Sequence, residues 1–560
     1  MLRFLLLLFM ATTLAACGGG GGGSSNPAGG EPARAPVISS FGASSTTITA
    51  GQSVVLSWQV AGADTLTLDN GVGTVTGNSV TVTPAVSALY TLTARNSVGT
   101  ATASVPVTVS AAPSALSDPN APFAVSYRGS DLDTASRQPL GGTEFRILVS
   151  HKGRLYGGLD SFRESPPAGV ARGAARIVVK ETAASPWRID RTFDQPLPPG
   201  APRQPGRPAI RHEGVTALAS VMFRNDGSGQ PLDQPVTLLV AGMRDFLSGL
   251  SVYVRDDANG TWSENVVERL ATSESTVRSL GAHRDKVTGA DLLLVGGNPG
   301  GVYSATYDRA RGLTFRVPAE IPYSPASQNE SVRPMAFAVC AGDAFVAQAP
   351  FIYRRIDGSN PRWEAVVDYS SQFTPILNGP SGLRGLTCVE RPGGAGPSLI
   401  AGFEGIGQVF RIDRVGTGWQ VASPPEYDVN RALSLLVGQT VDYTVIANNT
   451  FTPLVDPDTG QTVHLMTVQT RPALSDDAWY TIRSANGAHV LRTIRSTAFM
   501  PGLSLRSTRS AILSPFPEEN GRVVYIAGYD VVDDPSYNTA YVLRAGIRTV
   551  LGTASNPLSQ

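Results

Sequence analysis

A short hydrophobic segment that ends in two small residues recurs seven times in the C-terminal part of this 560-residue chain. Its copies are LYGG at 155–158, LLVAG at 238–242, LLVGG at 293–297, FVAQ at 345–348, LIAG at 399–402, VIAN at 445–448 and YIAG at 525–528. Such recurrence indicates an architecture in which each repeat is one supersecondary unit packed against its neighbours. The other elements of the unit therefore decide the fold.

Three further segments accompany most copies, so we expect four strands per repeat. A segment of the type VTALASV precedes the small-pair strand, and a strand such as LSVYVRD or QVFRID follows it. A strand headed by an aromatic residue comes last, and the heads are Trp187, Trp262, Phe315, Trp363, Trp419 and Trp479. Five of the six tryptophans thus share one repeat position, which indicates a common packing role.

Seven units of four strands, at about 60 residues each, resemble a seven-bladed β-propeller. The resemblance covers residues 123–553 and points to no subfamily, because the WD, kelch and aspartate-box patterns are not matched closely. It implies that FAVSYRGS, residues 123–130, supplies the outer strand of the last blade and closes the ring. Long gaps after 158 and 448 leave six or eight blades open as alternatives.

Residues 37–110 alternate apolar and polar residues in short runs such as SVVLSWQV and ALYTLTARN, separated by turn residues. This pattern predicts a small β-sandwich with Trp58 and Tyr90 in its core. The stretch resembles the Ig-like modules of bacterial surface lipoproteins, although it lacks the disulfide pair of that family. We expect an all-β chain in which this domain is a spacer, followed by a linker at 111–122 and ending in a tail at 554–560.

The N-terminus, MLRFLLLLFMATTLAAC, has one basic residue and a short apolar run, as an export signal does. Its LAAC ending resembles the lipobox of bacterial lipoproteins. That resemblance implies that the signal, residues 1–16, is removed and that Cys17 is lipidated. Gly18 rather than aspartate follows the cysteine, which favours the outer membrane. Residues 17–36 are rich in Gly and Ser, so we expect a flexible tether between the lipid anchor and the folded part.

Composition and motif spacing argue against several functional classes. Lys+Arg and Asp+Glu are equal at 45 each, so the chain lacks the basic excess of nucleic-acid-binding proteins. Five scattered histidines lack the spacing of zinc ligands, and no G-x-S-x-G motif occurs. We therefore predict no metal and no cofactor, and we assign no catalytic residue.

Two cysteines remain beside Cys17. Cys340 and Cys388 fall in corresponding strands of neighbouring repeats, but at opposite parity when the repeats are aligned on the arginines described next. Buried free thiols are therefore the favoured expectation, with a disulfide as the alternative in an oxidising compartment.

The inner strands share a polar feature at their start. Arginine stands one or two residues before the apolar part of five of them, and these residues are Arg278, Arg333, Arg384, Arg431 and Arg509. Thr216 fills the slot in the second repeat, and Arg146 falls close to it in the first. Because inner strands of a propeller begin at one mouth of the central channel, we expect an arginine ring there.

The loops after the small pairs open on the same face of a propeller. They carry Asp160, Arg244, Asp245, Asn298, Glu404, Asn449 and Asp530. We expect the glycine-rich GFEGIGQV at 402–409 to be such a loop rather than a nucleotide site, since no helix and no lysine follow it. Glu404 should then face the mouth near Arg384.

Two interpretations of this polar cluster stay open. The arginines could bind an anionic ligand, such as a carboxylate, a phosphate or a sulfated sugar. Alternatively, each arginine pairs with a loop acid and stitches the ring together. With either interpretation, the leading hypothesis is a lipid-anchored, non-enzymatic binding or scaffold protein whose loop-bearing face binds a glycan, a small anion or an envelope protein. The alternatives are an enzyme that uses the loop acids on a carbohydrate or another anionic polymer, and a factor in outer-membrane protein assembly.

Overall fold

The computed structural model describes residues 34–553 except 50–52, 85–86, 111–115, 162–163, 171, 202–208, 248, 271–273, 300, 323–332, 370–381, 447–450, 471–473, 500–503 and 530–536. The predicted signal, the lipidation residue Cys17, the C-terminal tail, Asn449 and Asp530 lie outside this range. The chain divides into two compact units, residues 1–112 and 113–560.

The first unit is a β-sandwich, as the alternating pattern predicts. One sheet has the order β1 (Val37–Ala43), β3 (Val54–Ala61), β6 (Ser79–Val82). The other has the order β2 (Thr47–Thr49), β8 (Thr100–Ser110), β7 (Ala88–Arg95), β4 (Thr65–Leu68), β5 (Gly73–Thr74). Trp58 and Tyr90 are both buried in the core between the sheets.

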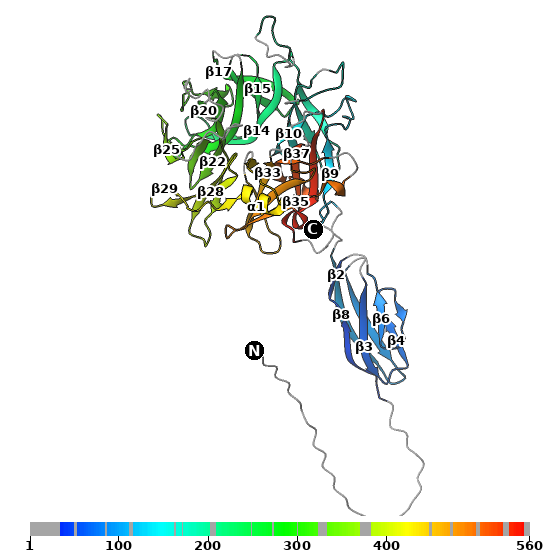
Figure 1. The fold of residues 1–560 in the computed structure, drawn as a ribbon. Helices are drawn as coiled ribbons and strands as arrows, with labels where there is room; N and C mark the ends of the chain where they lie inside the picture. Colours follow the sequence, from blue (N-terminus) through cyan, green and yellow to red (C-terminus); the bar gives the residue numbers. More distant parts are fainter. Residues whose placement is uncertain are drawn as a thin grey trace, which may run out of the picture. The chain divides into compact units, whose positions relative to one another are not determined.

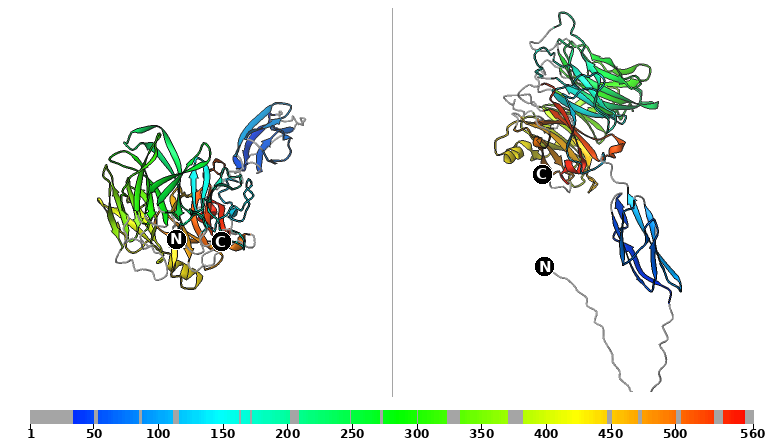
Figure 2. Two further views of the ribbon diagram at one scale, coloured as in Figure 1. Left: turned by 90° about the horizontal axis from the view of Figure 1, so that it is seen from above. Right: turned by 90° about the vertical axis from the view of Figure 1, so that its right-hand side faces the viewer.

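The second unit is a β-propeller, and its described part forms seven blades (Figures 1 and 2). Blade 1 is β10 (Glu144–His151), β11 (Arg154–Asp160), β12 (Ala175–Lys180) and β13 (Arg188–Phe193). Blade 2 is β14 (His212–Asn225), β15 (Pro231–Asp245), β16 (Leu250–Asp256) and β17 (Thr261–Glu268). Blade 3 is β18 (Ser275–Arg284), β19 (Asp291–Asn298), β20 (Gly301–Asp308) and β21 (Gly312–Phe315). Blade 4 is β22 (Pro334–Cys340), β23 (Asp343–Gln348), β24 (Phe351–Ile356) and β25 (Arg362–Asp368).

The last three blades contain the departures from regularity. Blade 5 is β26 (Leu383–Glu390), β27 (Pro397–Phe403), β28 (Gln408–Val415) and β29 (Gly418–Val421), with β30 (Tyr427–Asp428) beside β28. Blade 6 has β31 (Thr444–Ile446) and β32 (Thr452–Val455) on β33 (Thr462–Thr470), then β34 (Ala478–Arg483) and β35 (His489–Ile494). Blade 7 is β36 (Ser507–Leu513), β37 (Val523–Tyr529), β38 (Ala540–Gly546) and β9 (Ala124–Arg128), and α2 (Ile547–Leu551) follows β38.

β9 closes the ring, as expected for residues 123–130. It pairs antiparallel with β38, with Arg128 opposite Tyr541 and Ala124 opposite Arg544. The fourth strand of the last blade therefore comes from the N-terminal side of the propeller (Figure 1).

The interpretation of blade 6 was wrong. The segment RALSLLV lies in α1 (Val429–Val437), not in an inner strand. Asp428 caps the helix by accepting a hydrogen bond from the Arg431 backbone N–H, and Gly438 ends it in a left-handed conformation. Residues 445–448 were expected to form the second strand, but they begin in β31, which lies in the innermost layer of the blade. Every later strand therefore moves outward by less than expected, and Trp479 lies at the start of the third strand, β34, rather than the fourth. A short apolar run cannot distinguish a helix from a buried strand.

Side-chain links join the inner strands of neighbouring blades at every junction. Five links are hydroxyl hydrogen bonds: Ser510 to the Leu148 N–H (3.1 Å), Thr216 to the Val277 carbonyl (2.6 Å), Ser279 to the Pro334 carbonyl (2.7 Å), Thr387 to the Phe451 N–H (3.0 Å) and Thr452 to the Ala511 carbonyl (2.8 Å). His151 Nδ1 contacts Ser220 Oγ at 2.8 Å between blades 1 and 2. The junction of blades 4 and 5 holds a disulfide instead.

The disulfide joins Cys340 to Cys388, whose Cα atoms are 5.2 Å apart, so the expectation of free thiols was wrong. The error lay in aligning the two strands on their arginines. In blade 5, Arg384 pairs with Gly402, the last residue of the small pair. In blade 4 the corresponding residue, Gln348, pairs with Pro334 and not with Arg333. Shifting the alignment by one residue puts both cysteines on the same side of their strands, because side chains alternate with period two.

Candidate functional site

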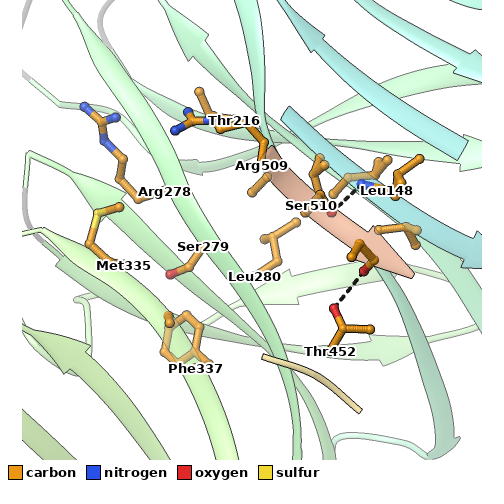
Figure 3. Close-up of a pocket in the computed structure, with 16 residues that line it drawn as sticks. Leu148, Thr216, Arg278, Ser279, Leu280, Met335, Phe337, Thr452, Arg509 and Ser510 are labelled. Atoms are coloured by element: carbon orange, nitrogen blue, oxygen red, sulfur yellow. Dashed lines mark hydrogen bonds between the residues drawn. The ribbon is translucent and has the colours of Figure 1, made fainter. Parts of the chain in front are cut away.

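β-Bulges turn a side chain toward the channel at the start of the inner strands. The ladder between inner and second strand slips by one residue at Arg146, Thr216, Arg278, Met335 and Arg509. A bulge leaves an extra residue outside the ladder and re-aims its side chain. The arginine ring therefore has a backbone cause, and Figure 3 shows Arg278 and Arg509 beside the cavity that they line.

The cavity occupies the channel and has a volume of about 200 Å³. Residues 147–149, 216–218, 278–280, 335–337 and 509–511, with Thr452, line it. They come from the inner strands of blades 1, 2, 3, 4, 6 and 7.

Arg333 and Arg384 start the inner strands of blades 4 and 5 and share one acid. Glu404 Oε2 accepts a hydrogen bond from Arg384 Nε at 2.6 Å and lies 3.8 Å from Arg333 Nη2. The Tyr443 hydroxyl donates to Glu404 Oε1 at 3.0 Å. Although burial alone would raise the pKa of Glu404, these cations and the hydroxyl hold it below its ordinary value. The expected proximity of Glu404 to Arg384 is confirmed.

The other described acids at the mouth are also ion-paired. Arg146 Nη1 lies 2.5 Å from Asp160 Oδ2, and Asp160 is fully buried. Further pairs join Arg509 to Glu144 (3.0 Å) and Arg244 to Glu213 (3.1 Å). Arg244 also lies 3.8 Å from Glu274. The pairs of Arg509 with Glu144 and of Arg244 with Glu274 join neighbouring blades, whereas the other two lie within one blade. Acids held in ion pairs are poor candidates for proton transfer in catalysis.

One arginine predicted for the ring and one loop acid predicted beside it have other surroundings. Arg431 is an exposed residue of α1, because its segment is a helix rather than an inner strand. Asp245 pairs with Arg211, whose Nη2 lies 2.6 Å from Oδ2, and this arginine also contacts Glu264 of β17. Asp245 therefore belongs to an ion triad with the outer strand rather than to the arginine ring.

Arg278 differs from its neighbours because no hydrogen bond or ion pair to it is found among the described residues, and its Nε is a buried donor without a partner there. Burial and the charges of Arg333, Arg244, Arg146 and Arg384 lower the pKa of its guanidinium well below the ordinary value. Arginine stays protonated in proteins, so the lowered pKa does not mean a neutral side chain. It means that the positive charge of Arg278 is poorly balanced by its surroundings. The side chain keeps partial solvent exposure, so a solute can reach it.

A second set of arginines, which the sequence interpretation did not single out, lies in the third strands. Arg255 Nη2 contacts Asp190 of the preceding blade at 3.0 Å, and the Trp262 indole N–H donates to the same acid at 2.8 Å. Blade 4 repeats this arrangement with Arg355, Glu320 and Trp363 at 2.8 and 2.9 Å. The R-x-D motif at 255–257, 355–357 and 411–413 is the signal that could have revealed these stitches.

Neither a metal centre nor a membrane-spanning helix is found in the described part of the chain. Its His, Cys, Asp and Glu side chains form no group of three or more placed to hold an ion. No helix there combines the length and the apolar character needed to cross a bilayer.

No protein-family model and no curated protein matches the sequence. Several solved structures are similar to it over most of their length. The BP39L lectin from Burkholderia pseudomallei is 12% identical, with 73% of this chain and 97% of that chain covered and a TM-score of 0.40. The intramolecular trans-sialidase from Ruminococcus gnavus is 10% identical, with 76% and 97% covered and a TM-score of 0.36. A quinonprotein alcohol dehydrogenase-like protein from Bacteroides thetaiotaomicron is 9% identical, with 82% and 97% covered and a TM-score of 0.30.

Proposed function

We propose that the protein is a non-enzymatic binding module of the cell envelope that takes an anionic ligand at the arginine-lined mouth of its propeller. The observation that carries the proposal is the contrast between Arg278 and its neighbours. Glu144, Asp160, Glu213 and Glu404 are each held by an arginine, whereas Arg278 faces a cavity without a counter-charge among the described residues.

A partly buried cation without a partner among the described residues is costly, and an anion that neutralises it recovers that cost on binding. The planar guanidinium fork suits carboxylate and phosphate oxygens. The same geometry weakens the enzymatic alternative, because acid–base catalysis needs a carboxyl that is free to exchange a proton at the cavity.

The proposal includes the membrane as a partner, through a lipid on Cys17. Residues 18–36 and the sandwich would then separate the propeller from the outer membrane. The support is the LAAC motif with its preceding apolar run and the Gly/Ser-rich composition of the segment after it.

Isothermal titration calorimetry of the full chain with small anions tests the site. Arg278→Gln removes the charge while keeping a polar side chain, and Arg431→Gln makes the same change at an exposed position outside the channel. We expect the first variant to lose at least 100-fold in anion affinity and the second to bind like the parent. Equal binding by the parent and the Arg278 variant would contradict the proposal.

A further inference from the structure

The charges around Arg278 limit the charge of the ligand. Eleven residues form the mouth cluster, in which each charge acts on others of the set: Arg146, Arg244, Arg278, Arg333, Arg384, Arg509, Glu144, Asp160, Glu213, Glu274 and Glu404. Among the described residues, six arginines face five acids, so one positive charge is left over within this part of the site. Arg172, 3.4 Å from Glu213, and Glu164, both from the segment after β11, add one charge of each sign.

The hydroxyl groups of the cavity wall limit the polarity of the ligand. Thr216, Ser279 and Thr452 each donate to a main-chain carbonyl of a neighbouring blade, at 2.6 to 2.8 Å. These three donors are already used in joining the blades, and Ser510, which accepts from the Leu148 N–H, keeps its own hydroxyl hydrogen. A sugar would therefore find few hydroxyl donors on this wall, and each of its polar groups left unmatched in the site costs free energy.

The remaining lining side chains favour an apolar group next to the charge. Leu218, Leu280, Met335 and Phe337 also line the cavity. In Figure 3 the guanidinium groups lie at one end, with Leu280 and Phe337 toward the other. A volume of about 200 Å³ exceeds the roughly 150 Å³ of an engineered cavity that admits benzene.

We infer that the ligand of this site is a small monocarboxylate with an apolar remainder of about the size of a benzene ring. Its carboxylate binds the fork of Arg278, and its apolar part lies against Leu280, Met335 and Phe337. This inference rests on the proposed function. It narrows the ligand from anions in general to a singly charged anion with an apolar part of limited size.

Calorimetry of the full chain with acetate, butyrate, benzoate, succinate, glucuronate and phosphate tests the inference. Each methylene buried should improve affinity about fourfold, so butyrate should bind about 15-fold more tightly than acetate. We expect benzoate to bind at least as tightly as butyrate. Succinate, glucuronate and phosphate should bind at least tenfold more weakly than butyrate. Arg278→Gln should abolish these differences, and Arg431→Gln should preserve them.

Met335→Ala gives a second readout, because Met335 lies on a bulge outside the main core clusters. It enlarges the cavity without touching the charge, so acetate affinity should hold while the optimum moves to acids larger than benzoate. Tighter binding of phosphate, succinate or glucuronate that depends on Arg278 would overturn the monocarboxylate inference and leave the proposed function standing. Absence of any binding that depends on Arg278 would overturn both.

Discussion

Two buried histidines should make the propeller lose stability as the pH falls from 8 to 5. His212 is fully buried, and its Nε2 shares a hydrogen bond of 3.1 Å with the Tyr253 hydroxyl. Its pKa is about 3. Burial lowers this pKa first, and the charge of Arg211 lowers it further. Burial likewise lowers the pKa of His464 to about 4. Both side chains are therefore neutral in the folded protein at pH 5.

The sign follows from the protons that each state binds. An unfolded imidazole takes up a proton below a pKa of about 6.5, and these folded ones do not, so acid favours the unfolded chain. At pH 5 each histidine costs about 2 kcal/mol relative to pH 8, and the two together cost about 4 kcal/mol. Carboxylates with depressed pKa values, such as Glu426 at about 2, add little until the pH falls below about 5.

Urea unfolding at pH 8, 6.5 and 5, followed by tryptophan fluorescence, measures this loss. The comparison is between the parent and the double variant His212→Gln, His464→Gln. Glutamine does not titrate, and any constant cost of the substitutions cancels when each protein is compared with itself across pH. We expect the double variant to lose about 4 kcal/mol less than the parent between pH 8 and pH 5. Equal losses in the two proteins would refute the assignment of the acid sensitivity to these residues.

Three further changes have expected outcomes. Cys17→Ala should abolish incorporation of a labelled fatty acid, which metabolic labelling detects, and retained label would exclude this residue as the anchor. Replacing Cys340 and Cys388 together by alanine should lower the free energy of unfolding by about 4 kcal/mol, because the disulfide closes a loop with a sequence separation of 48; an unchanged denaturation midpoint argues against the bridge. Glu404→Gln removes the acid that both Arg384 and Arg333 contact and should cost about 3 to 5 kcal/mol in the same assay, and a cost below 1 kcal/mol contradicts the ion pair.

Much of the propeller could be predicted from the sequence because its signals are local. The small-pair strands recur with the same kinds of strand before and after them. Residues 123–130 have the pattern of a strand but no complete repeat unit beside them in the sequence. The contact between Glu404 and Arg384 follows from repeat register alone. These features depend on spacing within one or two repeats.

The wrong predictions, of free thiols and of an inner strand at 431–437, arose where a single residue decides the strand register or the type of element. The bulge of β22 lies at Met335, so Arg333 precedes it by two residues, whereas Arg278 and Arg509 are themselves bulge residues. Alignment on arginines therefore mixed two registers and reversed the apparent parity of Cys340 and Cys388. The apolar run at 432–437 satisfies either a strand or a helix, and its cap, Asp428, decides for the helix.

The closing strand also sets an order of events in time. β9 belongs to the first residues of the propeller to be synthesised, and its partner β38 lies more than 400 residues later. Blades 1 to 6 can form as the chain emerges, but β9 has no ladder to join until blade 7 is complete. Contacts between such distant segments form slowly. Until then both strand edges stay open to pairing with other chains, so β9 has to be shielded while nearly the whole length of the propeller is synthesised.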